Sequence, residues 1–124
     1  MELTHTTVDL LLSADSKALA TNGPHGLNVV PVSTIRVVDG KIWLINYFFN
    51  KTVENILADK NVSLVGWKGF DGFQVKATAA YMTEGPQFDD AKALVSKLLP
   101  DRIVKGLVVL TPESVYNISP AAAS

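Results

Sequence analysis

The 124-residue chain contains no cysteine and only two histidines. The absence of cysteine excludes disulfide bonds, thiolate zinc sites, iron–sulfur clusters held by cysteine and thiol catalysis. His5 lies near the first residue and His25 lies in a turn-forming segment, so no three-ligand metal site or Ser-His-Asp relay is expected around them. The sequence therefore predicts no catalytic residue and no metal ligand, and redox chemistry would depend on a bound cofactor.

An excess of charge of one sign is also missing. The chain contains eleven Lys and Arg residues and twelve Asp and Glu residues, which gives a formal net charge of -1. Non-specific nucleic-acid binding needs a basic face, so no nucleic-acid partner is expected. The chain has no run of about 18 apolar residues, and residues 1–16 lack the basic and apolar regions of a signal peptide. We therefore expect no membrane association and a cytoplasmic protein.

The composition favours strands in a single domain. A chain of this length buries enough surface for one hydrophobic core but not for two, so residues 1–124 are expected to form one domain. Valine, isoleucine and threonine are abundant, which favours strands. The small-residue segment 119–124 is expected to be a frayed tail.

Turn-forming residues divide the chain into short strands. Asn22-Gly23-Pro24-His25-Gly26 predicts one hairpin connection, and Asp39-Gly40 is among the strongest short hairpin signals. A final segment forms either a strand pair or one strand bent at Pro112. The expected strands are 17–21, 27–38, 42–48, 62–68, 73–83 and the segments 104–110 and 114–118.

Two segments show helical spacing instead. Apolar residues recur at helical intervals in 51–59, with Asn50 as the N-cap, and again from Glu84-Gly85-Pro86 to Pro100. Short antiparallel strands with few helices predict a mainly β, α+β fold. We expect a compact barrel of about six antiparallel strands, with two to three short helices packed at its ends.

One predicted strand is apolar on both faces. Residues 42–45 read Ile-Trp-Leu-Ile, whereas a strand in a small barrel should have a more polar exterior face. Either a partner chain or a helix of the same chain covers the outer face. The sequence leaves these two alternatives open.

The helix that follows Asn50 begins with features of an anion site. The helix dipole disfavours the cation of Lys51 in the first turn, and an anionic ligand would reverse that effect. Free backbone N–H groups, the Thr52 hydroxyl and the Asn50 amide could join Lys51 in holding one phosphate group. The alternative is a solvated lysine that merely tolerates its position.

Aromatic residues precede this helix. Asn46-Tyr47-Phe48-Phe49 would place ring surface beside the candidate phosphate site. A planar aromatic ligand with one phosphate would satisfy both features, because rings stack and helix N-termini bind phosphate. Core packing is the alternative explanation for aromatic residues in strands.

Three motifs together resemble a known family. They are Val37-Val38-Asp39-Gly40, then Lys51-Thr52-Val53-Glu54-Asn55, then Gly72-Phe73-Gln74-Val75-Lys76-Ala77-Thr78-Ala79-Ala80-Tyr81 followed by Thr83-Glu84-Gly85-Pro86. Their order and spacing resemble the pyridoxamine 5'-phosphate oxidase-like FMN-binding split barrels, and most of all the small bacterial FMN-binding proteins among them. The resemblance covers about residues 8–118.

The resemblance implies a homodimeric split β-barrel with one FMN per subunit, bound in the groove between the two chains. It places the phosphate at the helix start, on Asn50, Lys51 and Thr52. The flavin would run along the second strand and border the end of the third strand, and the second subunit would complete the site. The residues implied for the flavin are Val30, Pro31, Val32, Ser33, Thr34, Ile45, Asn46, Tyr47 and Phe48, with Trp67, Gln74 and Tyr116 from the second subunit.

The implied function is that of an FMN-binding flavoprotein, either an electron-transfer protein or a small flavin-dependent reductase. Relatives place polar or aromatic side chains where this chain has Val29, Val30 and Pro31, so backbone groups would have to replace those side-chain contacts. The arginine-rich substrate site of the true oxidase is missing, which argues against oxidation of pyridoxamine phosphate. The alternatives are the same fold with a deazaflavin or haem, or a non-enzymatic β-barrel interaction module.

Overall fold

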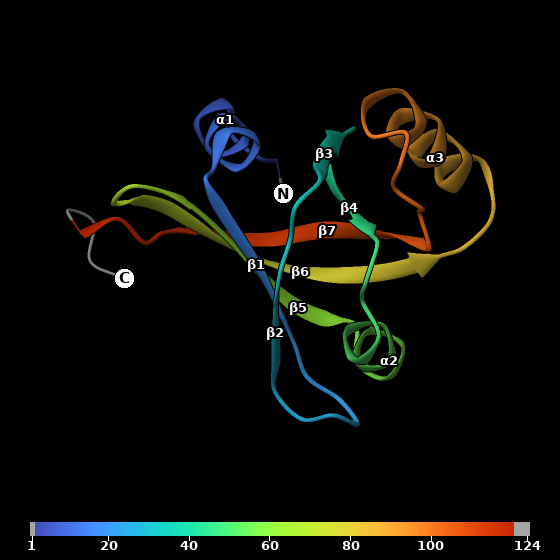
Figure 1. The fold of residues 1–124 in the computed structure, drawn as a ribbon. Coiled ribbons are helices and arrows are strands. Elements are labelled where there is room, and N and C mark those ends of the chain that lie inside the picture. The colour runs from blue at the N-terminus through green and yellow to red at the C-terminus, as the bar shows by residue number, and fades with distance from the viewer. Residues whose placement is uncertain (1, 121–124) are drawn as a thin grey trace.

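The computed structural model describes residues 2–120, which form seven strands and three helices (Figure 1). The fold is mainly β, as predicted. The elements are α1 (His5–Ser13), β1 (Ser16–Thr21), β2 (Asn28–Pro31), β3 (Ile35–Val38), β4 (Lys41–Asn46), α2 (Lys51–Ala58), β5 (Asn61–Lys68), β6 (Asp71–Met82), α3 (Pro86–Leu98) and β7 (Gly106–Asn117).

All seven strands belong to one antiparallel sheet that curls back on itself. The strand order is β2-β1-β5-β6-β7-β4-β3, so β2 and β3 form its two edges. These edge strands are consecutive in the chain, because only residues 32–34 separate them. The four Cα steps from Pro31 to Ile35 span at most about 14 Å, so the two edges lie close together. The result is an incompletely closed barrel whose open seam lies between β2 and β3.

Alternating strand residues fill the barrel interior, and two helices close it. Leu11 of α1 and Ile56 of α2 belong to the interior cluster, with relative exposures of 0% and 4%. Gly66 makes room for α1, because a Cβ at this position would lie 2.9 Å from a methyl group of Leu11. The buried residues of the interior cluster are Leu11, Leu19, Val32, Ile42, Leu44, Ile56, Val62, Leu64, Val75, Ala77, Ala79, Val108 and Leu110.

The third helix covers the outer face of β4 and β7. Trp43 and Ile45 point away from the barrel interior and pack in a second cluster with Phe88, Ala91 and Val95 of α3. This contact decides between the two alternatives for the doubly apolar strand, since a helix of the same chain covers it. The apolar strand β4 therefore gives no support for a partner chain, and α3 does not lie at a barrel end as expected.

The strand predictions are confirmed in most places. The Asp39-Gly40 turn connects β3 and β4, and both residues have positive φ angles, of 51° and 76°, as a type I′ hairpin requires. The last segment is one strand rather than a pair, and its register against β6 shifts between Lys76 and Ala77, where Pro112 pairs with Ala77. Pro112 thus bends β7 at a bulge.

The expected single strand 27–38 is wrong, because the structure divides it into β2 and β3. Pro31 ends β2, and Val32 donates its N–H to the carbonyl of Lys17 while Thr34 accepts from the N–H of Ile45. The chain thus leaves one sheet edge and joins the other within three residues. This crossing raises the strand number from about six to seven.

Helix α1 was not predicted. Its signals are present, because Thr4 caps the helix by accepting from the N–H of Thr7, and Leu11 lies on the buried face. The apolar stretch 8–12 is too short to show a clear period.

Near the C-terminus, Ser119 accepts a hydrogen bond from the N–H of Gly72, and residues 121–124 of the expected tail lie outside the described residues. Between residues 2 and 120, no helix has the length and apolar character needed to cross a membrane.

We predict that Ala91→Glu destabilises the protein far more than Ala93→Glu. Ala91 is completely buried between α3 and the sheet, so its replacement would bury an unpaired carboxylate. We expect a loss of about 3 kcal/mol or more in unfolding free energy, measured by urea denaturation. Ala93 is exposed on the same helix, and Ala93→Glu should change stability by less than about 0.5 kcal/mol. Equal effects would contradict the packing of α3 on β4.

Candidate functional site

A buried asparagine shapes the segment between β4 and α2. Asn46 is 1% exposed, and its Oδ1 accepts from the N–H of Phe49 at 2.6 Å while its Nδ2 donates to the Tyr81 hydroxyl at 2.9 Å. This bonding closes a tight turn over residues 46–49. Gly106 makes the bonding possible, because a Cβ there would overlap the Tyr81 ring and hydroxyl. The turn presents three consecutive aromatic residues, Tyr47, Phe48 and Phe49.

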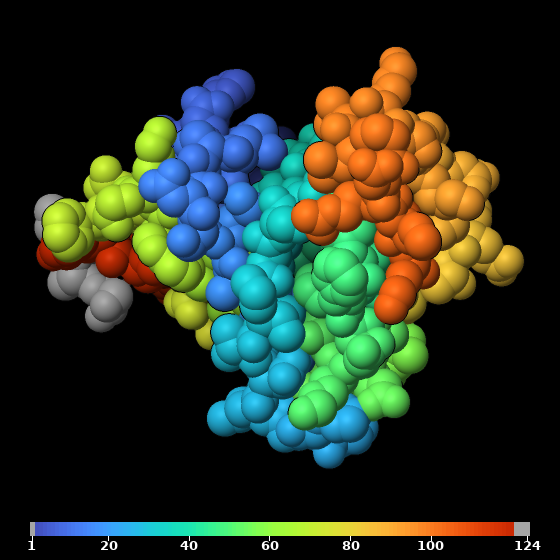
Figure 2. All heavy atoms as spheres, in the orientation of Figure 1, coloured from blue at the N-terminus to red at the C-terminus, as the bar shows by residue number. Residues whose placement is uncertain are grey.

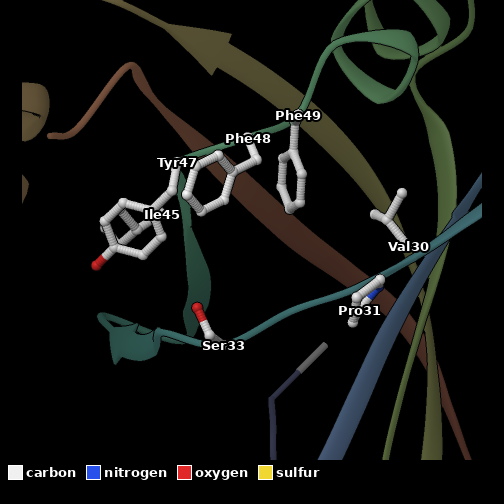
Figure 3. A pocket seen from close by; sticks show the side chains of 7 residues that line it. All are labelled: Val30, Pro31, Ser33, Ile45, Tyr47, Phe48 and Phe49. Carbon is white, nitrogen blue, oxygen red and sulfur yellow. The ribbon is translucent and has the colours of Figure 1, made fainter. Parts of the chain in front are cut away.

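These aromatic residues form one wall of a pocket at the open seam of the barrel. Figure 3 shows their rings on the connection between β4 and α2, with Val30 and Pro31 on the facing segment. In the space-filling view, this connection and the β2 segment lie side by side at the surface (Figure 2). The pocket has a volume of about 190 Å³ and is lined by Val30, Pro31, Ser33, Ile45, Tyr47, Phe48 and Phe49.

The pocket's aromatic wall has a fixed part and an exposed part. The Tyr47 ring is 5% exposed, its hydroxyl lies 3.1 Å from the Thr34 hydroxyl, and the Arg102 guanidinium lies 5.0 Å from its ring centroid. Phe48 is 76% exposed, with its ring tilted by 54° against that of Tyr47. An exposed phenylalanine at a pocket is apolar surface available to a planar ligand.

Helix α2 begins immediately after the aromatic wall. Its N-cap residue Asn50 makes no side-chain capping bond, so the first backbone N–H groups of the helix lack that partner. Lys51 is exposed in the first turn. Thr52 is 1% exposed, and its hydroxyl accepts from Nδ2 of Asn28 at 3.0 Å. An uncapped helix start with a lysine is suited to bind an anion.

The pocket and the helix start are neighbours, and together they offer surface for a planar ring and a phosphate. Phe49 lines the pocket, and the next residue, Asn50, is the N-cap of α2. A single ligand could therefore place its ring against the aromatic wall and its anionic group at the helix start. Small-molecule sites usually enclose about 300–1,000 Å³, so the volume of this pocket is sufficient for only part of such a ligand.

Most of the predicted site residues lie around this pocket. Val30, Pro31, Ser33, Ile45, Tyr47 and Phe48 line it directly. Thr34 holds the Tyr47 hydroxyl, and Asn50, Lys51 and Thr52 form the adjacent helix start. Two predicted residues point elsewhere: Val32 packs in the barrel interior, and the Asn46 side chain is used inside the protein.

The remaining three predicted residues do not reach this pocket. Gln74 and Tyr116 are cross-strand partners and share one face of the sheet, and Gln74 donates to the Ser63 hydroxyl at 3.2 Å. Trp67 is 39% exposed and borders a second depression of about 370 Å³ that also touches Val30 and Pro31. None of the three lines the pocket, although the depression beside Trp67 shares Val30 and Pro31 with it.

The sequence did not point to two polar residues near the site, Asn28 and Asn55. Phe49, in contrast, belongs to the aromatic segment expected beside the helix start, and it lines the pocket. Asn28 and Asn55 contribute hydrogen bonds to residues of other elements, which no local pattern reveals. Within residues 2–120, no group of three His, Asp or Glu side chains is placed to hold a metal ion.

The sequence of this chain matches a known family along almost its whole length. The family described as pyridoxamine 5'-phosphate oxidase matches residues 3–122. An uncharacterized protein of Methanocaldococcus jannaschii is 34% identical over 105 residues, which cover 81% of this chain and 70% of that protein.

Solved structures share the fold at low sequence identity. HupZ of Group A Streptococcus superposes with a TM-score of 0.86 at 20% identity, covering 98% of both chains. An FMN-binding protein of Syntrophomonas wolfei gives 0.77 at 17% identity, covering 92% of this chain and 87% of that chain. HutZ, the heme storage protein of Vibrio cholerae, gives 0.72 at 13% identity, covering 94% of both chains. The fold is thus a split barrel, and its neighbours include an FMN-binding and a heme storage protein.

We predict that Asn46→Ala destabilises the protein through the turn that carries the aromatic wall. The substitution leaves the Phe49 N–H and the Tyr81 hydroxyl without their partner. We expect a loss of about 1–3 kcal/mol, measured by urea denaturation. The control is Asn117→Ala, because Asn117 is exposed near the end of β7. An Asn46→Ala protein as stable as this control would show that the turn does not depend on Asn46.

Proposed function

The chain belongs to the pyridoxamine 5'-phosphate oxidase family, and on that premise we propose that it is an FMN-binding flavoprotein. It acts either as an electron-transfer protein or as a small flavin-dependent reductase. One observation supports the proposal above all: the aromatic wall of the pocket ends at Phe49, and the next residue, Asn50, opens α2 without a side-chain cap and beside the exposed Lys51. A flavin mononucleotide has the ring and the single phosphate that these two parts would bind.

The chain's own residues would bind and orient the cofactor. Phe48 and Phe49 offer ring surface, and Tyr47 is held in place by Thr34. The N–H groups at the start of α2 and the Lys51 ammonium would hold the phosphate through charge-assisted bonds. Bound FMN supplies one- and two-electron transfer, and the protein supplies position and electrostatics.

The composition of the pocket favours a flavin over haem. Haem iron is usually held by His, Cys, Met or Tyr. Of these residue types the pocket lining contains only Tyr47, whose hydroxyl already pairs with Thr34. The heme storage protein HutZ shares the fold, so haem titration is the direct comparison. A deazaflavin would use the same ring and phosphate contacts, and titration of each ligand separates the two.

Oxidation of pyridoxamine phosphate is not part of the proposal. The chain has two arginines, Arg36 and Arg102. Their guanidinium groups lie over the rings of Trp43 and Tyr47, at 6.0 Å and 5.0 Å from the ring centroids. Neither arginine lines the pocket, so no arginine-rich substrate site is formed there.

We propose further that the working form is a homodimer. The pocket of one chain is too small for a whole flavin, so a second chain would supply the missing wall. A row of residues across the sheet is available for that contact, since each member is at least partly exposed. The row consists of Pro31, Ala18, Val65, Gln74 and Tyr116.

We predict that Lys51→Ala weakens FMN binding but leaves riboflavin binding unchanged. Riboflavin carries the same ring without the phosphate, so it tests the ring contacts alone. The loss for FMN should be about 1–3 kcal/mol, as expected for a bond to a charged group. Fluorescence quenching of each flavin measures both affinities.

Lys60→Ala is the matched control for Lys51, because Lys60 is exposed just beyond the other end of α2. It should bind both flavins like the wild-type protein. Equal losses for FMN and riboflavin in Lys51→Ala would reject a phosphate contact. A wild-type protein that binds neither flavin would reject the proposed function.

We predict that Val65→Glu separates the dimer and weakens FMN binding at least tenfold. The change puts a carboxylate in the middle of the exposed row, where a partner's apolar surface would have to bury it. Light scattering measures the oligomeric state, and flavin titration measures affinity. Ala93→Glu, which adds the same charge to α3, should remain a dimer. A wild-type monomer with full FMN affinity would contradict the dimeric site.

A further inference from the structure

The loop between β1 and β2 is fastened to helix α2 by side chains of that helix. Asn55 of α2 is 0% exposed and lies under this loop. Its Oδ1 accepts from the N–H of His25 at 3.1 Å, and its Nδ2 donates to the carbonyl of Gly26 at 3.0 Å. The same Nδ2 donates to the Thr21 hydroxyl at 3.2 Å. One buried amide thus bonds to the loop and to the end of β1.

Two further contacts reinforce this connection. The His25 ring contacts the Glu54 carboxylate, and the Asn28 amide donates to the hydroxyl of Thr52 at 3.0 Å. The loop also fits closely, because a Cβ at Gly23 would lie 2.9 Å from Cα of Asn55. We call the contacts of residues 21–28 with Thr52, Glu54 and Asn55 the loop latch.

Stability alone does not require an asparagine at position 55. Replacing a buried hydrogen-bonded group together with its partners by apolar groups can be nearly neutral, whereas a buried amide is costly if any bond is lost. The neighbouring buried residue of α2, Ile56, packs in the interior cluster without polar bonds. The Asn55 amide instead fixes the path of the loop, because its bonds to two backbone groups of the loop form only in one arrangement.

The loop latch connects the two parts of the candidate site. Lys51 and Thr52 belong to the helix start that would hold the phosphate, and they lie four and three residues before Asn55 on the same helix. On the other side, the loop leads through Asn28 into β2, which carries Val30 and Pro31 of the pocket wall. Strand β2 is an edge strand that pairs with β1, so the latch is an added restraint on its position.

We propose that Asn55 is a positioning residue, which holds the β2 wall of the pocket in register with the phosphate-binding start of α2. This inference rests on the proposed function. A ligand with a ring and a phosphate gains from both contacts only if the two parts of the site are correctly spaced, since the second contact then forms at a high effective concentration. If the Asn55 bonds are lost, the two parts of the site are no longer held at the correct spacing, and the gain is lost although the ring-binding and phosphate-binding groups are unchanged.

The test compares the affinities for FMN and riboflavin. In the wild-type protein, the dissociation constant of riboflavin divided by that of FMN measures how much the phosphate adds to binding. Asn55→Ala should reduce this ratio at least tenfold while riboflavin affinity changes less than threefold. Gly23→Ala disturbs the same contact from the loop side and should also reduce the ratio. It provides the test if Asn55→Ala fails to fold.

A structural control separates positioning from loss of stability. Val75 is completely buried in the barrel interior and takes no part in the latch, so Val75→Ala should lower the melting temperature but keep the wild-type ratio. Hydrogen exchange gives a readout that needs no flavin. The backbone N–H groups of residues 22–28, except Pro24, which has none, should exchange at least tenfold faster in Asn55→Ala than in Val75→Ala.

The outcomes distinguish the inference from the function on which it rests. An unchanged affinity ratio in both latch variants, in a wild-type background that binds FMN, overturns the positioning role and leaves the proposed function intact. Unchanged exchange of residues 22–28 in Asn55→Ala overturns the latch itself. A wild-type protein that binds neither flavin overturns the proposed function and the positioning role with it, while exchange still tests the latch.

Discussion

The structure depends on the short link that joins the two edges of its sheet. Residues 32–34 carry the chain from β2 at one edge to β3 at the other, and the backbone bonds of Val32 and Thr34 tie each end of the link to a neighbouring strand. Because so few residues cannot span a wide gap, the sheet must curl. The link also leaves the seam open beside it, and the pocket lies at that seam, between β2 and the connection that follows β4.

Two buried asparagines then determine the shape of the opening. Asn46 folds the turn that presents the aromatic wall, and Asn55 fastens the loop that leads to the opposite wall. Both side chains bond to backbone groups, so each fixes the path of a segment rather than simply filling space. The interior cluster, in contrast, consists of apolar residues that any well-packed barrel requires. In this molecule the apolar core sets the fold, and the buried amides set the geometry of the site.

Two parts of the outer face of the sheet differ in what covers them. The outer face of β4 and β7 is covered by α3, which removes the need for a partner there. The row from Pro31 to Tyr116 crosses β2, β1, β5, β6 and the end of β7, and each of its residues is at least partly exposed. The outer face thus has a part that the chain covers itself and a part that is exposed. In the proposed dimer, the exposed part would meet the second chain, which would complete the small pocket at the seam.

Elements whose signals are local can be predicted from the sequence. The Asp39-Gly40 turn, the alternation along β6 and the helical spacing of α2 and α3 follow from backbone preferences and side-chain periods, and the aromatic run before α2 located the pocket. Three outcomes appear only in the folded chain: residues 27–38 form two strands, α3 covers Trp43, and Asn46 points inward instead of toward a ligand. These outcomes depend on partners distant in sequence: Lys17 for Val32, helix α3 for Trp43, and Tyr81 for Asn46. No local pattern encodes such a partner, because it becomes a neighbour only when the sheet curls.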